Sequence, residues 1–399
     1  MNILVVSHNI PRPTWGAGAR NYHLLRTLAR HHEVSLLALV DEHEANRFDT
    51  RHLDSYTHCR RLVPLRTAGY KRLHQVTSVA LRRSHLLSMY SSPQMQAALD
   101  ELLHTTPYDV VLFEGLIVAD HKLPPHTRMV IDEHNIEHEI LRRTVEQTRS
   151  PLRRWYNSQE YRRLKPAELA LCRRADAVLV TSERERALLA SALPATMLRV
   201  VPNGVDTAAF SPPEDGTEMP GRVAYTGMMS YYPNTHAVLR FAQYCWPFIR
   251  SQVPYATWQI VGSNPPPEVQ RLAELPGVEV TGSVPAIQPY LAQAAVAIAP
   301  IDIGSGTRLK ILEALAMGKA VVSTTVGCEG LDVTAGEHLL TADDLQEFAC
   351  AVSGLLQDPS RRGALGHAGR ALVEQRYSWD TCGAPLLSVL ETLRQAEAV

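Results

Sequence analysis

The sequence predicts an α/β protein with two doubly wound domains, in which parallel sheets are covered by helices on both faces. Short apolar runs typical of buried parallel strands alternate with helical segments in both halves of the chain. The alternation pauses once, near Val201–Asp206 and a following stretch rich in Pro, Glu, Asp and Gly. The length of 399 residues favours two or three domains, and an apolar content of 45% suffices for their cores.

The first half begins with strand, helix and strand, and the alternation continues after a basic region. Ser92 and Pro93 predict the start of a helix, because serine caps free N–H groups and proline fits the first turn. The predicted strands are Ile3–Val6, Glu33–Leu39, Tyr108–Phe113, Met129–Ile131 and Ala177–Val180, and a further helix is predicted at Asn21–Ala29.

The second half repeats this order. Its predicted strands are Val223–Thr226, Thr257–Val261, Val278–Thr281, Ala295–Ala299 and Ala320–Ser323, with a helix at Asn234–Ile249. We therefore expect an N-terminal domain at 1–201, a C-terminal domain at 202–380 and a last segment at 381–399. That segment contains a helix, roughly Cys382–Ala396, which we expect to cross back and brace the first domain.

Composition narrows the class of protein. No apolar run is long enough to span a bilayer, and Met1-Asn2 leads into the first strand without a basic leader, which indicates a cytoplasmic protein. Six scattered cysteines show no metal-type spacing, and we interpret them as reduced, buried thiols. The histidines form no ligand cluster either, so the sequence predicts neither a metal site nor a cofactor.

Charge is distributed unevenly. Residues 1–200 carry 28 Lys and Arg against 21 Asp and Glu, whereas residues 201–399 carry 12 against 20. Two basic stretches stand out, Arg51–Arg83 and Arg142–Arg174, and the second includes Trp155, Tyr156 and Tyr161. They are either solvated helix faces or a surface attracted to anionic lipid at the inner face of a membrane. Nucleic acid is not expected as a partner, because no nucleic-acid-binding motif accompanies the charge.

The most informative segment reads GSGTRLKILE and begins at Gly304. It follows a buried strand and opens an amphipathic helix that ends near Gly318. Gly304, Ser305 and Gly306 bring backbone close to a ligand, and the hydroxyl of Thr307 is the expected N-cap of the helix.

The same segment carries charges suited to a phosphorylated ligand. Arg308 and Lys310 add cations to a helix N-terminus, where free N–H groups already favour anions. Glu313, about one and a half turns further along, can accept hydrogen bonds from sugar hydroxyls. The segment therefore predicts a site for a nucleotide diphosphate-sugar.

Small residues also follow the other strands of the second half. They are Gly227, Gly262-Ser263 and Gly282-Ser283-Val284. Each alone is typical of an ordinary turn, but parallel strands end at one edge of a sheet, where ligands of such folds bind. Together with the segment at Gly304 they predict a binding edge.

Two segments of the first half are weaker candidates. The loop Ser7–Arg20 contains Gly16 and Gly18 between a strand and a helix, yet it does not have the spacing of a nicotinamide fingerprint. Asp132-Glu133-His134-Asn135 ends a strand, so a histidine or carboxylate there is expected to orient or deprotonate an acceptor hydroxyl. The alternative is a hydrogen-bonded structural histidine. Glu137-His138-Glu139 is expected to form the acidic first turn of the next helix.

These segments together resemble the retaining glycosyltransferases of family 4, which share the two-domain GT-B fold. The matching segments are GAGAR, VIDEHN, VPNGVD, VAYTG, VTGSV and IGSGTRLKILEALAMGKAVVSTTVGCEGL, and the last is the most specific. Within the family the chain looks most like bacterial enzymes of exopolysaccharide and cell-surface glycan assembly.

The resemblance implies roles for individual residues. Gly16 and Gly18 would approach the donor from the first domain, and His134 matches the histidine near the transferred sugar. The backbone around Val284 would contact the base, and Glu313 would bind the ribose hydroxyls. The implied donor-binding set also contains Gly227, Met228, Gly262, Gly304, Ser305, Gly306, Thr307 and Leu309.

The chain departs from the family pattern in two places. Ser305 stands where the first glutamate of a Glu-x7-Glu motif is usual, so a contact to the transferred sugar is missing. The Arg and Lys that commonly follow the VAYTG strand are also absent, because Met228–Asn234 reads MMSYYPN. We infer that Arg308 and Lys310 neutralise the diphosphate instead.

The sequence therefore predicts transfer of a sugar from a UDP- or GDP-type donor to a glycan or lipid-linked acceptor, with retention and without metal. Catalysis by His134, Arg308 and Lys310 would be mainly electrostatic. Two alternatives remain open. The chain could be a nucleotide-sugar 2-epimerase, which needs several acids and bases, or a non-catalytic sugar-nucleotide-binding subunit, because Ser305 replaces an expected glutamate.

Overall fold

The computed structural model describes residues 1–13, 17–41, 50–65, 83–193, 198–212, 217–304 and 306–395. Gly16 and Ser305 lie outside the described residues, as does the part of the basic stretch at 66–82. The chain divides into two compact units. Unit 1 comprises Met1–Pro202 and Gly383–Val399, and unit 2 comprises Asn203–Cys382.

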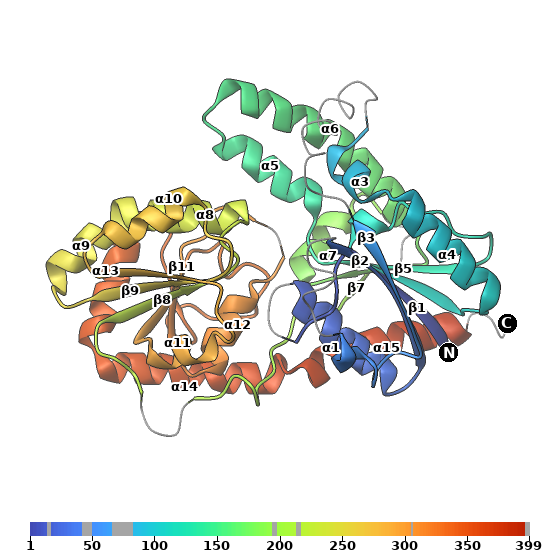
Figure 1. The fold of residues 1–399 in the computed structure, drawn as a ribbon. Coiled ribbons are helices and arrows are strands. Elements are labelled where there is room, and N and C mark those ends of the chain that lie inside the picture. Colours follow the sequence, from blue (N-terminus) through green and yellow to red (C-terminus); the bar gives the residue numbers. More distant parts are fainter. Residues whose placement is uncertain are drawn as a thin grey trace. The chain divides into compact units, whose positions relative to one another are not determined.

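Unit 1 contains a seven-stranded parallel sheet in the order β3-β2-β1-β4-β5-β6-β7 (Figure 1). Its strands are β1 (Asn2–Ser7), β2 (Glu33–Asp41), β3 (Cys59–Leu65), β4 (Val110–Glu114), β5 (Arg128–Glu133), β6 (Ala177–Val180) and β7 (Leu198–Val200). The central strands are buried on both faces, as their continuous apolar runs predict.

Helices cover this sheet. They are α1 (Ala17–Ala29), α3 (His85–Tyr90), α4 (Pro93–Thr105), α5 (Glu137–Gln147), α6 (Pro151–Arg174) and α7 (Glu183–Ala190), with short 3₁₀ turns at Arg51–Leu53 and Leu116–Val118. Ser92 caps α4 as predicted, since its side chain accepts a hydrogen bond from the N–H of Met95. The predicted acidic first turn of α5 is also confirmed.

Unit 2 contains a six-stranded parallel sheet in the order β10-β9-β8-β11-β12-β13. Its strands are β8 (Arg222–Thr226), β9 (Thr257–Val261), β10 (Val278–Gly282), β11 (Val296–Ala299), β12 (Ala320–Ser323) and β13 (Leu340–Thr341). Helices α8 and α9 lie on one side of this sheet and α11 and α14 on the other (Figure 1).

The helices of unit 2 follow the alternation that the sequence predicts. They are α8 (Tyr232–Arg240), a π-helical turn (Phe241–Cys245), α9 (Trp246–Gln252), α10 (Pro267–Gln270), a 3₁₀ turn (Arg271–Glu274), α11 (Gln288–Gln293), α12 (Leu309–Ala316), α13 (Leu345–Gln357) and α14 (Pro359–Arg376). The last helix, α15 (Trp379–Gln395), starts in unit 2 and belongs to unit 1 from Gly383 onward. There Gly383 lies against Thr27 of α1.

Two expectations are wrong. The N-cap of α12 is Arg308 and not Thr307, because the Thr307 hydroxyl accepts a hydrogen bond from the Asn203 side chain at 2.7 Å instead. The cysteines are free thiols, but only three are buried; Cys59 and Cys350 are exposed.

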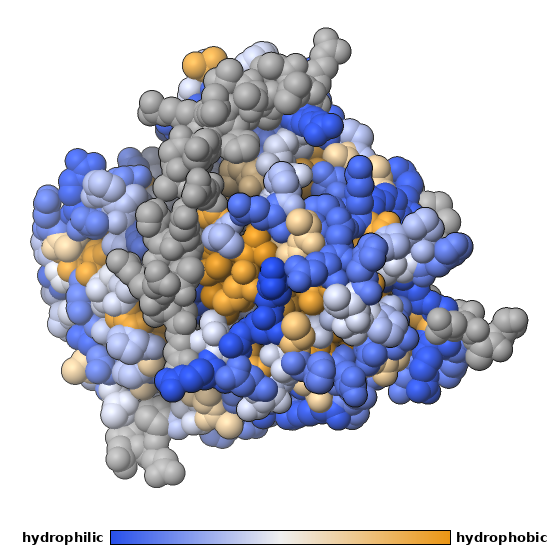
Figure 2. Space-filling view, turned by 45° about the vertical axis from the view of Figure 1, so that its right-hand side comes forward, coloured by the Kyte–Doolittle hydropathy of each residue, from blue (hydrophilic) through white to orange (hydrophobic). Residues whose placement is uncertain are grey.

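The molecular surface is mixed. Hydrophilic side chains predominate on the face shown in Figure 2, and apolar ones gather in smaller patches. Among the described helices, none combines the length and the apolar character that crossing a membrane requires.

Candidate functional site

The carboxyl ends of the parallel strands in unit 2 form one edge, and the glycine-containing loops leave from it. The loops after β8 and β9 begin with Gly227 and Gly262, and β8 lies between β9 and β11 in the sheet. Gly304 follows β11 at the same edge. Val284 lies beyond β10, the outermost strand on the other side of β9. The sheet therefore assembles loops that are up to 77 residues apart in sequence.

Backbone segments approach each other closely at this edge. A Cβ atom at Gly262 would overlap the carbonyl oxygen of Gly227, so glycine is required there. The N–H of Gly227 donates to the Val261 carbonyl at 3.0 Å, and the N–H of Met229 donates to the Ser263 carbonyl at 2.8 Å. The first two loops are thus held to each other by their main chains. Met228, which lies between Gly227 and Met229 in the loop after β8, is 42% exposed.

Lys310 lies in the first turn of α12 and points back to the end of β8. Its amine donates hydrogen bonds to the Tyr225 hydroxyl at 2.8 Å and to Oδ1 of Asn234 at 2.9 Å. A Cβ at Gly227 would stand 2.8 Å from the same amine. Burial lowers the pKa of Lys310 to about 7, and the neighbouring Arg308 acts in the same direction.

Arg308 and Glu313 lie on the same segment. The Arg308 guanidinium donates to the carbonyl oxygens of Gly306 and Val326, and a Cβ at Gly304 would stand 2.6 Å from it. Glu313 is buried on α12, and this burial raises its pKa to about 7 although Lys310 opposes the shift. The segment therefore gathers two cations and one carboxyl group near neutrality.

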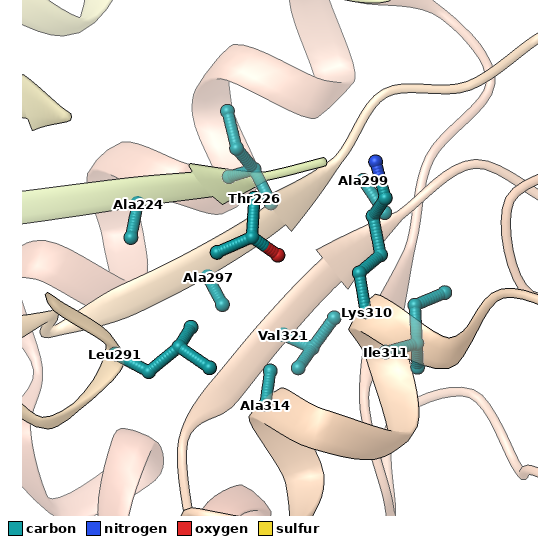
Figure 3. A pocket seen from close by; sticks show the side chains of 10 residues that line it. Ala224, Thr226, Leu291, Ala297, Ala299, Lys310, Ile311, Ala314 and Val321 are labelled. Carbon is teal, nitrogen blue, oxygen red and sulfur yellow. The ribbon is translucent and has the colours of Figure 1, made fainter. Parts of the chain in front are cut away.

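A small cavity lies behind this edge, between α12 and the sheet (Figure 3). Its volume is about 10 Å³, no more than one water molecule needs. In Figure 3 the Lys310 side chain rises from α12 and its amine points away from the aliphatic residues Leu291, Ala314 and Val321. The cavity is a packing gap, and the polar chemistry lies at the strand ends.

Unit 1 places a second group of charges at its own strand ends. Arg20 on α1 donates from Nε and Nη2 to both carboxylate oxygens of Asp132, at 2.8 and 2.7 Å, and both side chains are fully buried. Its Nη1 donates to the carbonyl of Pro202 at 3.2 Å. A buried bidentate pair of this kind fixes the end of β5.

His134 joins this pair. Its Nε2 lies 3.1 Å from Oε2 of Glu114 and 3.2 Å from Oδ2 of Asp132. Burial alone would lower the pKa of His134, but the two carboxylates raise it to about 9. At neutral pH the imidazole is therefore protonated and acts as a hydrogen-bond donor. Of the two expected roles, orienting a hydroxyl fits this state, whereas deprotonating one does not.

Glu114, Asp132 and His134 are residue types that can bind a metal ion. One potential donor atom from each lies within 4.8 Å of the others. The Arg20 guanidinium, however, uses both oxygens of Asp132, and a protonated imidazole has no lone pair for a cation at Nε2. The chemistry of this group therefore favours an ion-pair network.

Several functional groups are not evident from the sequence pattern. Arg20 ends the GAGAR segment and Tyr225 lies within VAYTG, two segments that match the family without indicating these side chains, and Asn234 belongs to the segment that lacks an arginine and a lysine. The absence of an arginine and a lysine from this segment is therefore the sequence feature that could have pointed to Asn234. Gly18 makes only ordinary contacts at the start of α1, near Arg12.

Models of two protein families match the chain. The model of Glycosyltransferase Family 4 matches residues 15–209, and the model of Glycosyl transferases group 1 matches residues 220–358. Each match falls almost entirely within one of the two units.

Curated relatives match over about half of the chain. A GDP-mannose-dependent alpha-(1-6)-phosphatidylinositol monomannoside mannosyltransferase of Mycolicibacterium smegmatis is 32% identical over 56% of this chain and 64% of its own length. A similar mannosyltransferase of Corynebacterium glutamicum is 28% identical over 48% and 55%. A lipopolysaccharide core mannosyltransferase of Rhizobium leguminosarum is 29% identical over 58% and 68%. The chain thus spans less than two thirds of the first two relatives.

Solved structures share the fold over nearly the whole chain. A sucrose-phosphate synthase from Thermosynechococcus elongatus superposes with a TM-score of 0.74 at 19% identity, covering 99% of both chains. Anabaena HepE, solved with UDP and glucose, gives 0.69 at 17% identity, covering 98% of this chain and 100% of its own. With two parallel-sheet units of this kind and a match to both family models, the chain belongs to the glycosyltransferases of family 4 and has the GT-B fold.

Proposed function

We propose that the protein transfers a hexose from a nucleotide diphosphate-sugar to a glycan or lipid-linked acceptor, with retention of anomeric configuration and without a metal ion. The observation that carries this proposal is the edge of unit 2, where Arg308, Lys310 and Glu313 stand beside glycine-lined loops. Cations and exposed backbone suit a diphosphate, and a carboxyl group suits ribose hydroxyls.

The cations would act on the leaving group. As the bond between the anomeric carbon and the diphosphate oxygen breaks, negative charge grows on that oxygen. Arg308, Lys310 and the first N–H groups of α12 would stabilise this charge, which is the role that a metal ion has in other transferases. The acceptor oxygen would bond to the anomeric carbon on the same face, and its proton would pass to the departing phosphate.

His134 would hold a hydroxyl of the sugar or the acceptor. Its protonated ring donates hydrogen bonds, and Asp132 and Glu114 keep it in that state. The structure does not favour a 2-epimerase, which needs several acids and bases at its site. Both carboxylate oxygens of Asp132 accept hydrogen bonds from Arg20, and Glu133 is buried within the fold.

The relatives suggest where to look for the donor and acceptor. Their names specify GDP-mannose and either a phosphatidylinositol mannoside or a lipopolysaccharide core. We therefore propose GDP-mannose as the first donor to test, with UDP-sugars beside it, and a lipid-linked glycan as the acceptor.

The test is transfer of labelled sugar from each donor into a lipid extract, in the presence of EDTA. Product formation from one donor, with the same anomeric configuration in donor and product by NMR, is the expected result. Conversion of the donor sugar without any acceptor would point to an epimerase. If the protein binds the donor but transfers its sugar in none of the extracts, the result would indicate a non-catalytic sugar-nucleotide-binding subunit.

We also propose that the protein contacts anionic membrane through the turn between α5 and α6. A groove of about 480 Å³ there is lined by Arg149, Arg154 and Arg162 around Trp155. Leu152 and Trp155 are 75% and 54% exposed. Basic residues near anionic lipid contribute about 1 kcal/mol each, and exposed tryptophan suits the interfacial region.

Co-sedimentation with phosphatidylglycerol vesicles tests this contact. The double variant Arg149→Gln/Arg162→Gln should bind several-fold less than wild type, whereas Arg271→Gln/Arg361→Gln, with the same charge change on unit 2, should bind normally. Equal binding of wild type to neutral and anionic vesicles would contradict the electrostatic contact.

A further inference from the structure

Three side chains at the end of β8 form a closed ring of hydrogen bonds. The Tyr225 hydroxyl donates to Oδ1 of Asn234 at 2.7 Å, and the Lys310 amine donates to both of these oxygens, at 2.8 and 2.9 Å. The amine also lies 3.9 Å from the centre of the Tyr225 ring. The three residues come from β8, α8 and α12 and are up to 85 residues apart.

When Lys310 is protonated, the ring has only one arrangement of protons. The Asn234 amide is fixed because its Nδ2 donates to the carbonyl of Met228 at 2.9 Å, which leaves Oδ1 as the acceptor. The Tyr225 proton then belongs to Asn234, and the Tyr225 lone pair faces Lys310. Tyr225 is fully buried and Asn234 is 8% exposed, so neither can replace these bonds with solvent at low cost.

This arrangement leaves capacity for an anion. A protonated lysine has three N–H donors, and the ring uses two of them. Both acceptors are neutral, so no carboxylate in the ring compensates the charge. The Lys310 amine lies against the backbone of the loop after β8, because a Cβ atom added at Gly227 would be only 2.8 Å from it.

Building on the proposed function, we propose that Tyr225 and Asn234 are positioning residues for the donor diphosphate. They hold the Lys310 amine at the end of β8 with one N–H directed to a phosphate oxygen, in a chain whose β8 loop has no cation of its own. The segment MMSYYPN thus supplies Asn234 to hold a cation that comes from α12.

A measurable consequence is proton uptake. Burial lowers the pKa of Lys310 to about 7, so part of the population is neutral at pH 7. A bound diphosphate favours the charged amine and raises that pKa. The contribution of Lys310 to proton uptake on nucleotide binding should therefore be a fraction of a proton at pH 7 to 8 and almost none at pH 5.5. Arg308 and Glu313 face the same amine, and Glu313 and the terminal phosphate of the nucleotide add proton changes of their own.

The test is calorimetry of GDP and UDP binding in two buffers with different ionisation enthalpies, which yields the number of protons taken up. Tyr225→Phe should weaken nucleotide binding roughly tenfold, which corresponds to about one charge-assisted hydrogen bond. Asn234→Asp places a carboxylate against the amine, and should both weaken binding and remove the part of the proton uptake that belongs to Lys310. Tyr232→Phe, the same chemical change at a half-exposed position on α8, is the control and should behave as wild type.

The outcomes separate this inference from the proposed function. If wild type binds nucleotide with proton uptake and both ring variants bind equally well, the ring only supports the fold and the inference is wrong, while the donor site stands. If wild type binds no nucleotide, the donor site itself is refuted, and the inference with it. Thermal unfolding of each variant shows whether a loss of binding reflects a loss of structure.

Discussion

Asp132 and Glu133 are adjacent in the chain, yet their environments shift their pKa values in opposite directions. Burial alone would raise both. The cations Arg20 and His134 hold the pKa of Asp132 well below its usual range, whereas Glu168 adds to burial and raises the pKa of Glu133 well above its usual value. Since side chains alternate along β5, one faces the candidate site and the other faces α6.

The proton on Glu133 has a structural explanation. Glu168 on α6 accepts hydrogen bonds from the N–H groups of Glu137 and His138, at 3.0 and 2.9 Å, and from the His138 ring at 2.9 Å. Its side chain therefore satisfies free N–H groups at the N-terminus of α5. Within the part of the chain that the structure describes, neither oxygen of Glu133 has a hydrogen-bond partner, and its carboxyl group keeps its proton.

Replacing Glu133 with Gln should stabilise unit 1 at neutral and alkaline pH. The folded state retains a proton that the unfolded chain releases above about pH 4.3, so wild-type stability falls as pH rises from there to the folded-state pKa. The slope is about 1.4 kcal/mol per pH unit. Glutamine does not titrate, so urea unfolding at pH 5 and pH 8 should show a gain of at least about 1 kcal/mol at the higher pH only.

Glu101→Gln provides the comparison, since Glu101 is 60% exposed and its removal should change stability by less than about 0.5 kcal/mol at either pH. A Glu133→Gln variant that is less stable than wild type at pH 8 would show that Glu133 is ionised in the folded protein.

Sequence patterns identified candidate residues as a group only where these residues are close together in the chain. Arg308, Lys310 and Glu313 share one segment, and the structure keeps them together. The role that we propose for Tyr225 and Asn234 depends on Lys310, whose position follows from the packing of α12 and is absent from any local pattern. The expected N-cap at Thr307 was wrong for the same reason. The Thr307 hydroxyl accepts a hydrogen bond from Asn203, which lies 104 residues away in the sequence.

Among the elements, buried parallel strands were predicted best. Ala177–Val180, Thr257–Val261 and Ala320–Ser323 occur with the expected bounds, since strands covered on both faces are uniformly apolar. The strands β3, β7 and β13 were not predicted, and each lies at a sheet edge. Of these, β3 carries Arg60, Arg61 and Pro64, as edge strands commonly do. The long helix α6 lacks an apolar stripe, so its sequence gives no helical periodicity.

Gly262→Ala should damage the loops after β8 and β9, because the added methyl group would overlap the carbonyl oxygen of Gly227. Unit 2 must then shift backbone at the candidate site, and we expect a loss of about 2 kcal/mol or more of stability together with loss of nucleotide binding. Denaturant unfolding and calorimetry measure the two effects.

Gly363→Ala is a matched change within α14 of the same unit, where a Cβ would meet nothing within 4 Å. It should raise stability by about 0.5 to 1 kcal/mol, because alanine is the better helix former. Equal effects of the two substitutions would contradict the close approach of the loops.

At the scale of the whole molecule, α15 joins the two ends of the chain in one unit. Its buried residues Leu386, Val389, Leu390 and Leu393 belong to unit 1, and Arg128 at the start of β5 donates to the carbonyl of Leu393. The helix thus completes a domain whose other residues lie before Pro202. The sequence analysis expects a helix over roughly Cys382–Ala396 that braces the first domain, and α15 covers Trp379–Gln395.

A chain ending at Cys382 should therefore lose stability in unit 1 alone. The removed leucines are buried in unit 1, where Gly383 of the same helix lies against Thr27 of α1, and their loss costs about 1.5 to 3 kcal/mol for each large side chain. Hydrogen exchange should show faster exchange in α1 and unchanged protection in β9. Uniform loss of protection in both units would contradict the division of the chain.

The central claim is that the edge of unit 2 binds a nucleotide diphosphate through Arg308 and Lys310. The most direct measurement is calorimetric binding of GDP, UDP, ADP and their sugar conjugates in EDTA, to wild type, Arg308→Ala and the exposed control Arg271→Ala. We predict selective binding without metal that weakens about 30-fold or more in Arg308→Ala, since charge-assisted bonds are lost, and is unchanged in the control. Absence of binding by every nucleotide, or equal affinity of wild type and Arg308→Ala, would contradict the account.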